Sequence, residues 1–540
     1  MQHFSFDPHD PVFDLDGWRL SLQVISFENT YGLPPSDVTR AGDIWSVRAD
    51  QLTQAGGRRT ATGTAAIDAT RTDDGIAVTL SATIGDDDLP LSTMWRGGRG
   101  VRCTKLIVSG LPPGDLLGHR WARERVTRAG STVHYPATTH TALVFLALDE
   151  GGYLYFESLD DRVRAKRFAA MRRDDNTITV ELIHEDAAYA MSNSITTPAW
   201  RIGRTDDPEA IVRRHDAHTA AAFGLQPWET RPDVPAWARD VALVVALHGM
   251  HWSGYVFNTY DDMRAAVDYV ADRIDGRRVL AFLPGWEGRY YWQYGDYRPE
   301  PLLGGADAFP RLAAAARVRG VHLMPMFGAN CVNTNIPGYE QWGAPAEMRS
   351  PSGLVFQGNR PDWDVSRAHD PGWQAWLNPG APSWRARLVE QVTALVATYD
   401  LPAVFFDTQH VWINAPNYDL YDGLVALRDE LKSRFPDLLI AGEGWYDALG
   451  AVTPMSHAGL PAAWPETFAK YNRNWLHLSA GDPSRGSTGV HELGHNDFRL
   501  APDEPHILPT LTVVDGTLAN GADGVDRVIA QAREYARRLL

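Results

Sequence analysis

Two acidic residues each end a short apolar run, and their placement suits paired chemistry. Asp407 ends AVFFD at 403–407, and Glu443 ends LLIAGE at 438–443. If these runs are neighbouring parallel strands, about 4.8 Å apart, the carboxyl groups can approach the ~5–5.5 Å separation used in retaining hydrolysis of a glycosidic bond. One would act as nucleophile, and the other would protonate the leaving oxygen and then activate water. An inverting pair would require ~6.5–9.5 Å.

A purely structural interpretation competes with this one. Asp407 could cap the helix that follows its strand, and Glu443 could form a buried salt bridge. Two acids at consecutive strand ends, with aromatic residues around them, favour the chemical role.

The ends of the other apolar runs carry side chains that suit a polyhydroxylated ligand. Aromatic rings in loops can stack on sugar faces, as we expect for Trp286 and Trp445, and amide, imidazole and carboxyl groups can bind hydroxyls. The candidate substrate-binding residues are His251, Trp252, Trp286, Glu287, Asp296, Asn330, Gln409, Trp445, His495 and Asp497.

Residues 491–495 read HELGH, which matches the HExxH pattern of zinc peptidases. In those enzymes a helix presents the two histidines to zinc, but the preceding GDPSRGSTGV is poor helix material and no HxxGxxH continuation follows. We therefore expect a strand over 487–492 that leads into a polar loop. His495 and Asp497 would bind sugar hydroxyls there, or Asp497 would brace the site, and we expect no metal ligands.

The chain divides into two regions of different periodicity. Residues 1–205 contain short β-rich runs such as IAVTLSATI and TALVFLALDEGGYLYFES, separated by turn residues, which predicts a β-sandwich domain. Residues 206–236 form a linker, with a helix over 207–224 and the proline-bearing connector RPDVPAW.

In residues 237–540 apolar runs alternate with helical stretches, the pattern of parallel βα units. This predicts a (β/α)8 TIM barrel rather than the alternative, a doubly wound sheet, because no glycine-rich phosphate fingerprint follows the first strand. We expect strands at 241–247, 278–283, 321–327, 403–407, 438–443, 460–464 (the weakest), 487–492 and 508–514.

Composition narrows the classes of partner and compartment. A chain of 540 residues exceeds one hydrophobic core, and a net charge of -16 argues against nucleic acid and anionic membranes. A neutral carbohydrate substrate fits better, and no cofactor is implied. The two cysteines, Cys103 and Cys331, suit a reducing compartment. Neither a signal-peptide pattern nor a membrane span is evident, so we expect a cytoplasmic protein. The oligomeric state stays open, a homodimer being one option.

Several segments together resemble a known group of enzymes. They are GWEGRYYWQYGDYRPEPLLGG, LNPGAPSWR before a long helix, VFFDTQ and IAGEGW. With the order sandwich, linker helix, barrel, they resemble α-glycosidases that carry a supersandwich before the catalytic barrel, in particular endo-α-N-acetylgalactosaminidases and their many bacterial relatives. The resemblance covers roughly 235–515.

This resemblance implies a retaining α-glycosidase with Asp407 as nucleophile and Glu443 as acid/base. A similar layout in the α-amylase superfamily adds an Asp after the seventh strand, where Asp497 is the candidate, although GHND departs from that family's usual order. We expect no C-terminal β-domains of the kind that large secreted relatives carry, which favours an oligosaccharide or glycoconjugate fragment as substrate. The alternatives are a non-catalytic carbohydrate-binding barrel and the zinc peptidase.

Overall fold

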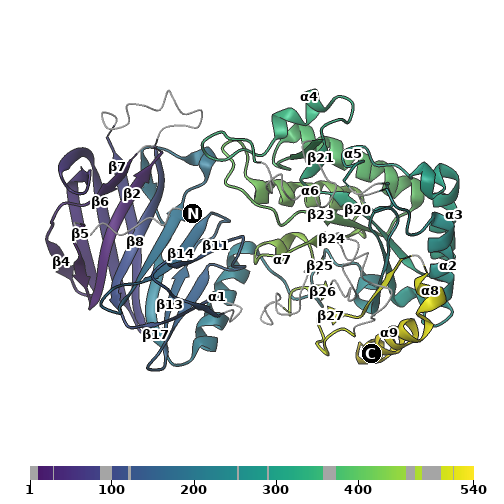
Figure 1. The fold of residues 1–540 in the computed structure, drawn as a ribbon, viewed down its shortest axis with the longest axis horizontal. Coiled ribbons are helices and arrows are strands. Elements are labelled where there is room, and N and C mark those ends of the chain that lie inside the picture. The colour runs from purple at the N-terminus through teal and green to yellow at the C-terminus, as the bar shows by residue number, and fades with distance from the viewer. Residues whose placement is uncertain are drawn as a thin grey trace.

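The computed structural model describes residues 10–27, 29–85, 100–118, 123–251, 254–288, 291–356, 373–457, 469–476, 500–514 and 516–539. Figure 1 shows a β-rich body formed by the N-terminal part of the chain and, beside it, a body of strands ringed by helices. None of the described helices is long and apolar enough to cross a membrane.

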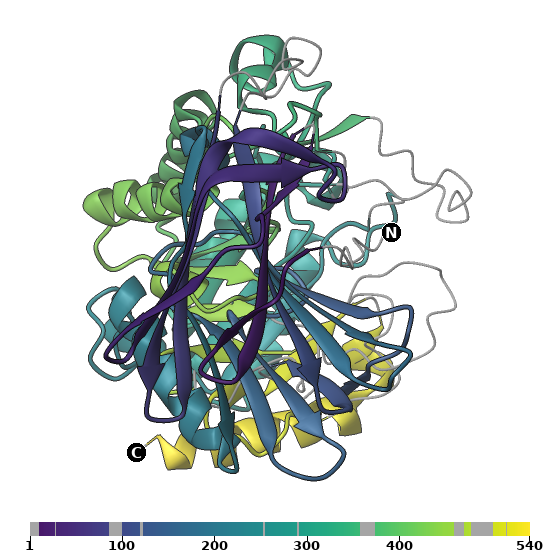
Figure 2. The same ribbon diagram turned by 90° about the vertical axis from the view of Figure 1, so that its left-hand side faces the viewer.

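The first body is a network of seventeen antiparallel strands, and Figure 2, turned to face it, shows them twisted across the front of the barrel. The strands are β1 (Phe13–Leu15), β2 (Trp18–Ser26), β3 (Thr30–Gly32), β4 (Val38–Ala41), β5 (Ile44–Gln54), β6 (Arg59–Thr72), β7 (Gly75–Ile84), β8 (Val101–Leu111), β9 (Gly114–Gly118), β10 (Arg123–Arg125), β11 (Ser131–Tyr135), β12 (Leu143–Leu148), β13 (Tyr153–Ser158), β14 (Lys166–Arg172), β15 (Ile178–Glu185), β16 (Ser194–Thr196) and β17 (Trp200–Thr205).

Hydrophobic periodicity explains which faces of this domain are buried. In β7, residues Ile76, Val78 and Leu80 alternate with more exposed neighbours, so one face meets the core. Strand β12 is instead buried along its whole length. The reason is helix α1 (Pro208–Phe223), whose Ile211 and Val212 pack on the outer face of this sheet.

Helix α1 confirms the helix expected over 207–224. Asp207 caps its first turn by accepting a hydrogen bond from the Ala210 N–H, Pro208 occupies the first turn, and Gly224 ends it in the left-handed conformation.

The second body is a ring of parallel strands, not an open doubly wound sheet. Its members are β18 (Leu243–Leu247), β19 (Val279–Leu283), β20 (His322–Gly328), β23 (Ala403–Asp407), β24 (Leu439–Glu443), β25 (Met455–His457), β26 (Arg473–Trp475), β27 (Ile507–Leu508) and β28 (Thr510–Val513). Strand β27 pairs with β26 and β28 pairs with β18, on either side of Pro509. Because proline has no N–H for the ladder, one strand position is split in two, and the ring has eight positions.

The expected sixth and seventh strands were misplaced. The ring positions belong to β25 and β26, three residues each, whereas 460–464 and 487–492 lie outside the described residues. Polar residues occupy both short strands, and they are too short to show a periodicity.

Helices surround the ring, with a small ribbon on its upper side (Figure 1). They are α2 (Tyr260–Ala271), α3 (Gly305–Arg319), α4 (Tyr339–Trp342), α5 (Pro382–Tyr399), α6 (Leu420–Arg434), α7 (Leu449–Val452), α8 (Thr517–Asn520) and α9 (Ala522–Arg538), and the ribbon pairs β21 (Cys331–Asn333) with β22 (Gln374–Trp376).

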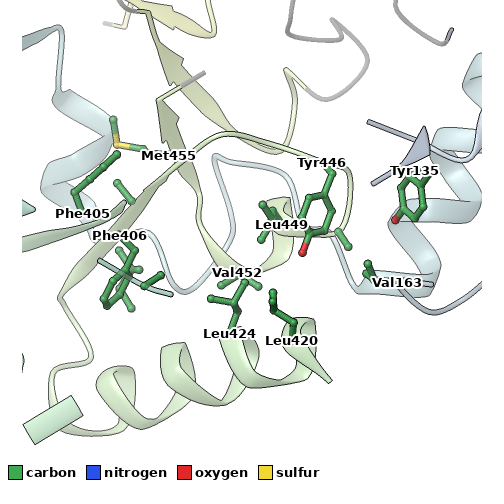
Figure 3. Close-up of a cluster of buried hydrophobic side chains, with 14 of the residues drawn as sticks. Tyr135, Val163, Phe405, Phe406, Leu420, Leu424, Tyr446, Leu449, Val452 and Met455 are labelled. Carbon is green, nitrogen blue, oxygen red and sulfur yellow. The ribbon is translucent and has the colours of Figure 1, made fainter. Parts of the chain in front are cut away.

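The two bodies meet at the loop that follows β24. The Tyr135 hydroxyl donates to Asp447 Oδ1 at 2.6 Å, and the Asp447 N–H donates to the carbonyl of His140 at 2.9 Å. Tyr135 also packs edge-on against Tyr446, with ring centroids 6.5 Å apart. Figure 3 shows the two side chains next to each other, Tyr135 on the β-domain and Tyr446 on the barrel. The β-domain therefore braces a loop that begins one residue after Glu443.

Candidate active site

The barrel brings Asp407 and Glu443 together at its carboxyl-terminal edge. They are the last residues of β23 and β24, adjacent parallel strands in which Phe406 lies opposite Gly442. Asp407 is 2% exposed, whereas the Glu443 side chain keeps 29% of its surface in solvent. The expected placement at consecutive strand ends is confirmed, and their catalytic roles stay a prediction.

Asp407 receives a hydrogen bond from a residue that lies far from it in sequence. The Tyr294 hydroxyl donates to Asp407 Oδ2 at 2.7 Å. Tyr294 belongs to the aromatic loop after β19, and it is fully buried. A donor at this position stabilises the carboxylate form of Asp407.

Glu443 is held by the residue that follows Asp407. The Thr408 backbone N–H donates to Glu443 Oε2 at 3.0 Å, and His410 Nδ1 lies 3.5 Å from the same oxygen. Thr408 adopts a φ of +63°, which is unfavourable for a β-branched residue. Its hydroxyl donates to Asn330 Oδ1 at 2.5 Å, a contact that helps to hold this strained conformation.

The two carboxyl groups titrate as a pair. Burial raises the pKa of Asp407 well above its usual range, and the neighbouring Glu443 charge adds to the shift. Burial likewise raises the pKa of Glu443, opposed by hydrogen bonds from Asp407 and from the Thr408 N–H. Two carboxyl groups in contact cannot both ionise readily, so the pair retains one proton at a pH where isolated exposed carboxyl groups have lost theirs. One protonated acid beside one carboxylate is the state that glycoside chemistry requires.

Glu287 adds a third buried carboxyl group. It is 0% exposed, and neither carboxyl oxygen has a hydrogen-bond partner in another described residue. Burial raises the pKa of Glu287 well above its usual range, and the charge of Asp407 contributes. The structure thus places Glu287 within the electrostatic reach of Asp407, with its surface closed to solvent.

Three other candidates lie in packed surroundings. Trp286 is 0% exposed, donates its indole N–H to the Met326 carbonyl at 2.8 Å and packs against Phe309. Its ring therefore belongs to the core and has no open face for a sugar. Trp445 packs against His140 of the β-domain, with ring centroids 5.5 Å apart. Gln409 is buried and donates to Thr453 Oγ1 at 3.0 Å.

The remaining candidates divide between the rim and regions outside the described residues. Asn330 is buried and accepts the hydrogen bond from the Thr408 hydroxyl. His251 is buried after β18, against Phe257. Asp296 is partly exposed beside Arg298, at 3.7 Å, and is not part of the carboxyl pair. Trp252, His495, Asp497 and the HELGH segment lie outside the described residues.

Three site residues were missed from the sequence: Tyr294, Thr408 and His410. Thr408 and His410 follow Asp407 directly in DTQH, so proximity to a strand end was a usable signal. Tyr294 is one of several tyrosines in YYWQYGDY, and nothing in that run distinguishes it. Within the described part of the chain, no group of three or more His, Cys, Asp or Glu residues is arranged to hold a metal ion.

No protein-family profile and no curated protein matches the sequence. Solved structures do share its fold. The α-N-acetylgalactosaminidase NagBb from Bifidobacterium bifidum, in complex with GalNAc, aligns with a TM-score of 0.65 at 12% identity, covering 97% of this chain and 90% of that one. The GH36 α-galactosidase AgaA from Geobacillus stearothermophilus gives 0.51 at 14% identity, with 98% and 76% coverage.

The α-galactosidase from Lactobacillus brevis gives a TM-score of 0.52 at 13% identity, with 96% and 73% coverage. At these identities the comparison concerns the fold. It confirms that the chain has the β-domain and barrel architecture of such α-glycosidases, the group that the sequence segments resemble.

Proposed function

We propose that the chain is a retaining α-glycosidase that acts on an oligosaccharide or glycoconjugate with a terminal α-linked galactose or N-acetylgalactosamine. The observation that carries the proposal is the contact between Asp407 and Glu443 at adjacent strand ends, where each carboxyl group shifts the pKa of the other. The choice of sugar rests on the α-galactosidases and the α-N-acetylgalactosaminidase that share the fold.

The hydrogen bond between the two carboxyl groups raises the pKa of Asp407 and lowers that of Glu443, so in the free protein the proton favours Asp407. In the proposed mechanism this proton passes to Glu443 when substrate binds. Asp407, then ionised and supported by the Tyr294 hydroxyl, attacks the anomeric carbon. Glu443 gives its proton to the leaving oxygen as the glycosidic bond breaks, so the products are a glycosyl ester on Asp407 and a free alcohol. Glu443, now a carboxylate that accepts the Thr408 N–H, then removes a proton from water. That water displaces Asp407 and releases the sugar with its original anomeric configuration.

The closeness of the carboxyl groups supports retention. A sugar that binds between the two carboxyl groups must move them apart. A retaining enzyme needs a separation of only ~5–5.5 Å, whereas an inverting enzyme needs ~6.5–9.5 Å. The retaining geometry therefore requires the smaller movement from the observed contact.

Aryl α-galactoside and aryl α-N-acetylgalactosaminide hydrolysis tests the proposal. Asp407→Asn and Glu443→Gln should each lower the rate by roughly three orders of magnitude or more. Azide added to Asp407→Ala should yield a glycosyl azide, and NMR of the wild-type reaction should show the α-anomer first. Near wild-type rates in both variants would refute the assignment. Sugar binding without turnover would instead favour a non-catalytic carbohydrate-binding barrel.

A further inference from the structure

The β-domain carries a second cleft, away from the carboxyl pair. It has a volume of about 500 Å³, within the range of small-ligand sites, and it lies across β2, β3, β5, β8 and β15. Side chains alternate along these strands, so Leu22 and Val24 of β2 face the hydrophobic core and Gln23 and Ile25 face the cleft. The cleft therefore occupies the face of the sheet that is turned away from the core.

This face buries polar groups to an extent that a solvated sheet surface does not. Gln23 is 5% exposed, and Glu185 is buried at the cleft wall. Lys105, which lies opposite Gln23 on the neighbouring strand β8, forms a buried ion pair with Glu181 at 3.0 Å. Burying polar groups costs free energy unless hydrogen-bond partners are supplied. A cleft lined by such groups therefore suggests a binding site rather than an incidental hollow of the surface.

The side chains that line the cleft match a neutral, hydroxyl-rich ligand. Gln23, Asn29 and Gln54 each carry an amide that can donate and accept hydrogen bonds, as sugar hydroxyls do. Gln23 donates to Asp10, and Asn29 donates to Gln54 Oε1 at 2.6 Å. Each amide NH2 group has two N–H donors, of which these bonds use one. Phe27 offers an apolar ring, with the Arg102 guanidinium 5.8 Å from its centroid.

The charges in the cleft are balanced. Arg167 pairs with Glu185, and Asp10 accepts a hydrogen bond from Gln23 at 2.6 Å. Arg102 lines the cleft with its guanidinium over the Phe27 ring, and guanidinium donors suit the oxygens of sugar hydroxyls. Two arginines against two carboxylates give no net charge, which disfavours phosphates and nucleic acid.

One end of the cleft lies next to a contact between the β-domain and the barrel. Glu185 ends β15, and the next residue, Asp186, accepts a hydrogen bond through its carbonyl from Asn414 at 2.8 Å. Asn414 also accepts the Ala188 N–H at 2.7 Å. Asn414 lies on the loop that connects Asp407 to α6, so the loop of the proposed catalytic site contacts the edge of the cleft.

We propose that this cleft is a second carbohydrate-binding site, for a neutral sugar unit of an oligosaccharide. The choice of a sugar as the ligand rests on the proposed function, whereas the cleft itself is described from its lining residues. Arg102, Gln23 and Asn29 bind hydroxyl groups, and the Phe27 ring packs against the sugar's apolar face.

Hydrogen–deuterium exchange of the full-length Asp407→Asn protein, with and without saturating stachyose, tests this inference. Stachyose should slow exchange in peptides covering 22–32 and 101–104 of the cleft and, separately, in peptides covering 403–411 of the barrel. Adding Arg102→Ala or Asn29→Ala should abolish the protection in the cleft peptides and leave that at 403–411. Arg213→Ala, an exposed arginine of α1 outside the cleft, is the matched control and should retain both.

The two proposals fail in different ways. Cleft peptides that stachyose leaves unprotected, or that stay protected in both Arg102→Ala and Asn29→Ala, would overturn the second site. The failure of the proposed function appears instead in the aryl glycoside assay of wild-type protein. Thermal unfolding of each variant identifies any that has lost its fold. Asn29 is exposed to solvent, so Asn29→Ala is the variant that we expect to disturb the fold least.

Discussion

Thr408 donates its backbone N–H to Glu443 Oε2 at 3.0 Å, and it does so from a left-handed backbone conformation with a φ of +63°. The residue after one carboxyl group thereby orients the other. Positions of this kind cost about 1–3 kcal/mol and persist only when their surroundings hold them. Here the hydrogen bond from Thr408 Oγ1 to Asn330 is one such support.

Replacing Thr408 with valine tests that support. Valine keeps the branched shape but removes the hydroxyl, so buried Asn330 loses a hydrogen bond and the free energy of unfolding should fall by about 1–3 kcal/mol. Chemical denaturation measures the change. Thr408→Ser, which keeps the hydroxyl, is the control and should stay within about 0.5 kcal/mol of wild type. Equal stability of the valine and wild-type proteins would show that the contact contributes nothing.

Replacing Tyr294 with phenylalanine should change the pH dependence of hydrolysis. The Tyr294 hydroxyl lowers the pKa of Asp407 against the larger effect of burial, so its removal raises that pKa further. A nucleophile must be ionised, and the acidic limb of kcat/KM should therefore move to higher pH. Tyr418→Phe, at an exposed tyrosine of the loop between β23 and α6, should leave the limb in place. A limb that stays unmoved in Tyr294→Phe would separate Tyr294 from the titration of Asp407.

Alanine at Gly444 should disturb the site through a steric clash. Gly444 has a φ of +70°, and an added Cβ would overlap the His410 ring, next to Glu443. We expect activity to fall by about tenfold or more, because small displacements of catalytic groups are costly. Gly42→Ala is a matched control, since Gly42 has a φ of +63° with no atom near the added Cβ. It should show a similar backbone cost in thermal unfolding and wild-type activity.

Asp447→Asn should change stability in a pH-dependent way. Burial raises the pKa of Asp447 from 3.8 to about 6, so the folded protein favours the protonated acid. As pH rises from about 4 to about 6, the unfolded chain ionises first, and the wild type loses up to about 3 kcal/mol of stability from this group. Asparagine cannot ionise, so the stability of the variant relative to wild type should increase over this window and then level off. Urea unfolding at several pH values measures it, and a constant difference would contradict the assignment.

The sequence predicted most of what depends on periodicity. The apolar runs that end at Asp407 and Glu443 are strands β23 and β24, and the helix expected over 207–224 is α1. The domain boundaries at 205/206 and 236/237 and the cytoplasmic location stay predictions.

Side-chain direction could not be predicted in the same way. Trp286 and Trp445 stand in glycine-containing segments that suggested open loops, yet both pack inside the protein, one against Phe309 and the other against His140. Whether a loop tryptophan faces solvent or a neighbouring element depends on tertiary contacts that a single sequence does not encode locally. Tyr294 reaches Asp407 for the same reason, across 113 positions of the chain.

The hydrogen bond between Tyr135 and Asp447 joins residues 312 positions apart, and this separation bears on how the protein is made. Domains generally fold as units while the chain emerges from the ribosome, the N-terminal one first. We therefore expect Tyr135 to be in place before Asp447 has been synthesised, so that the folded β-domain offers a surface on which the loop after Glu443 packs. The ring closes later still, when the segment around Pro509 supplies its last position. Ribosomes that pause between these two segments would hold a chain whose first domain is folded and whose carboxyl pair is not yet enclosed.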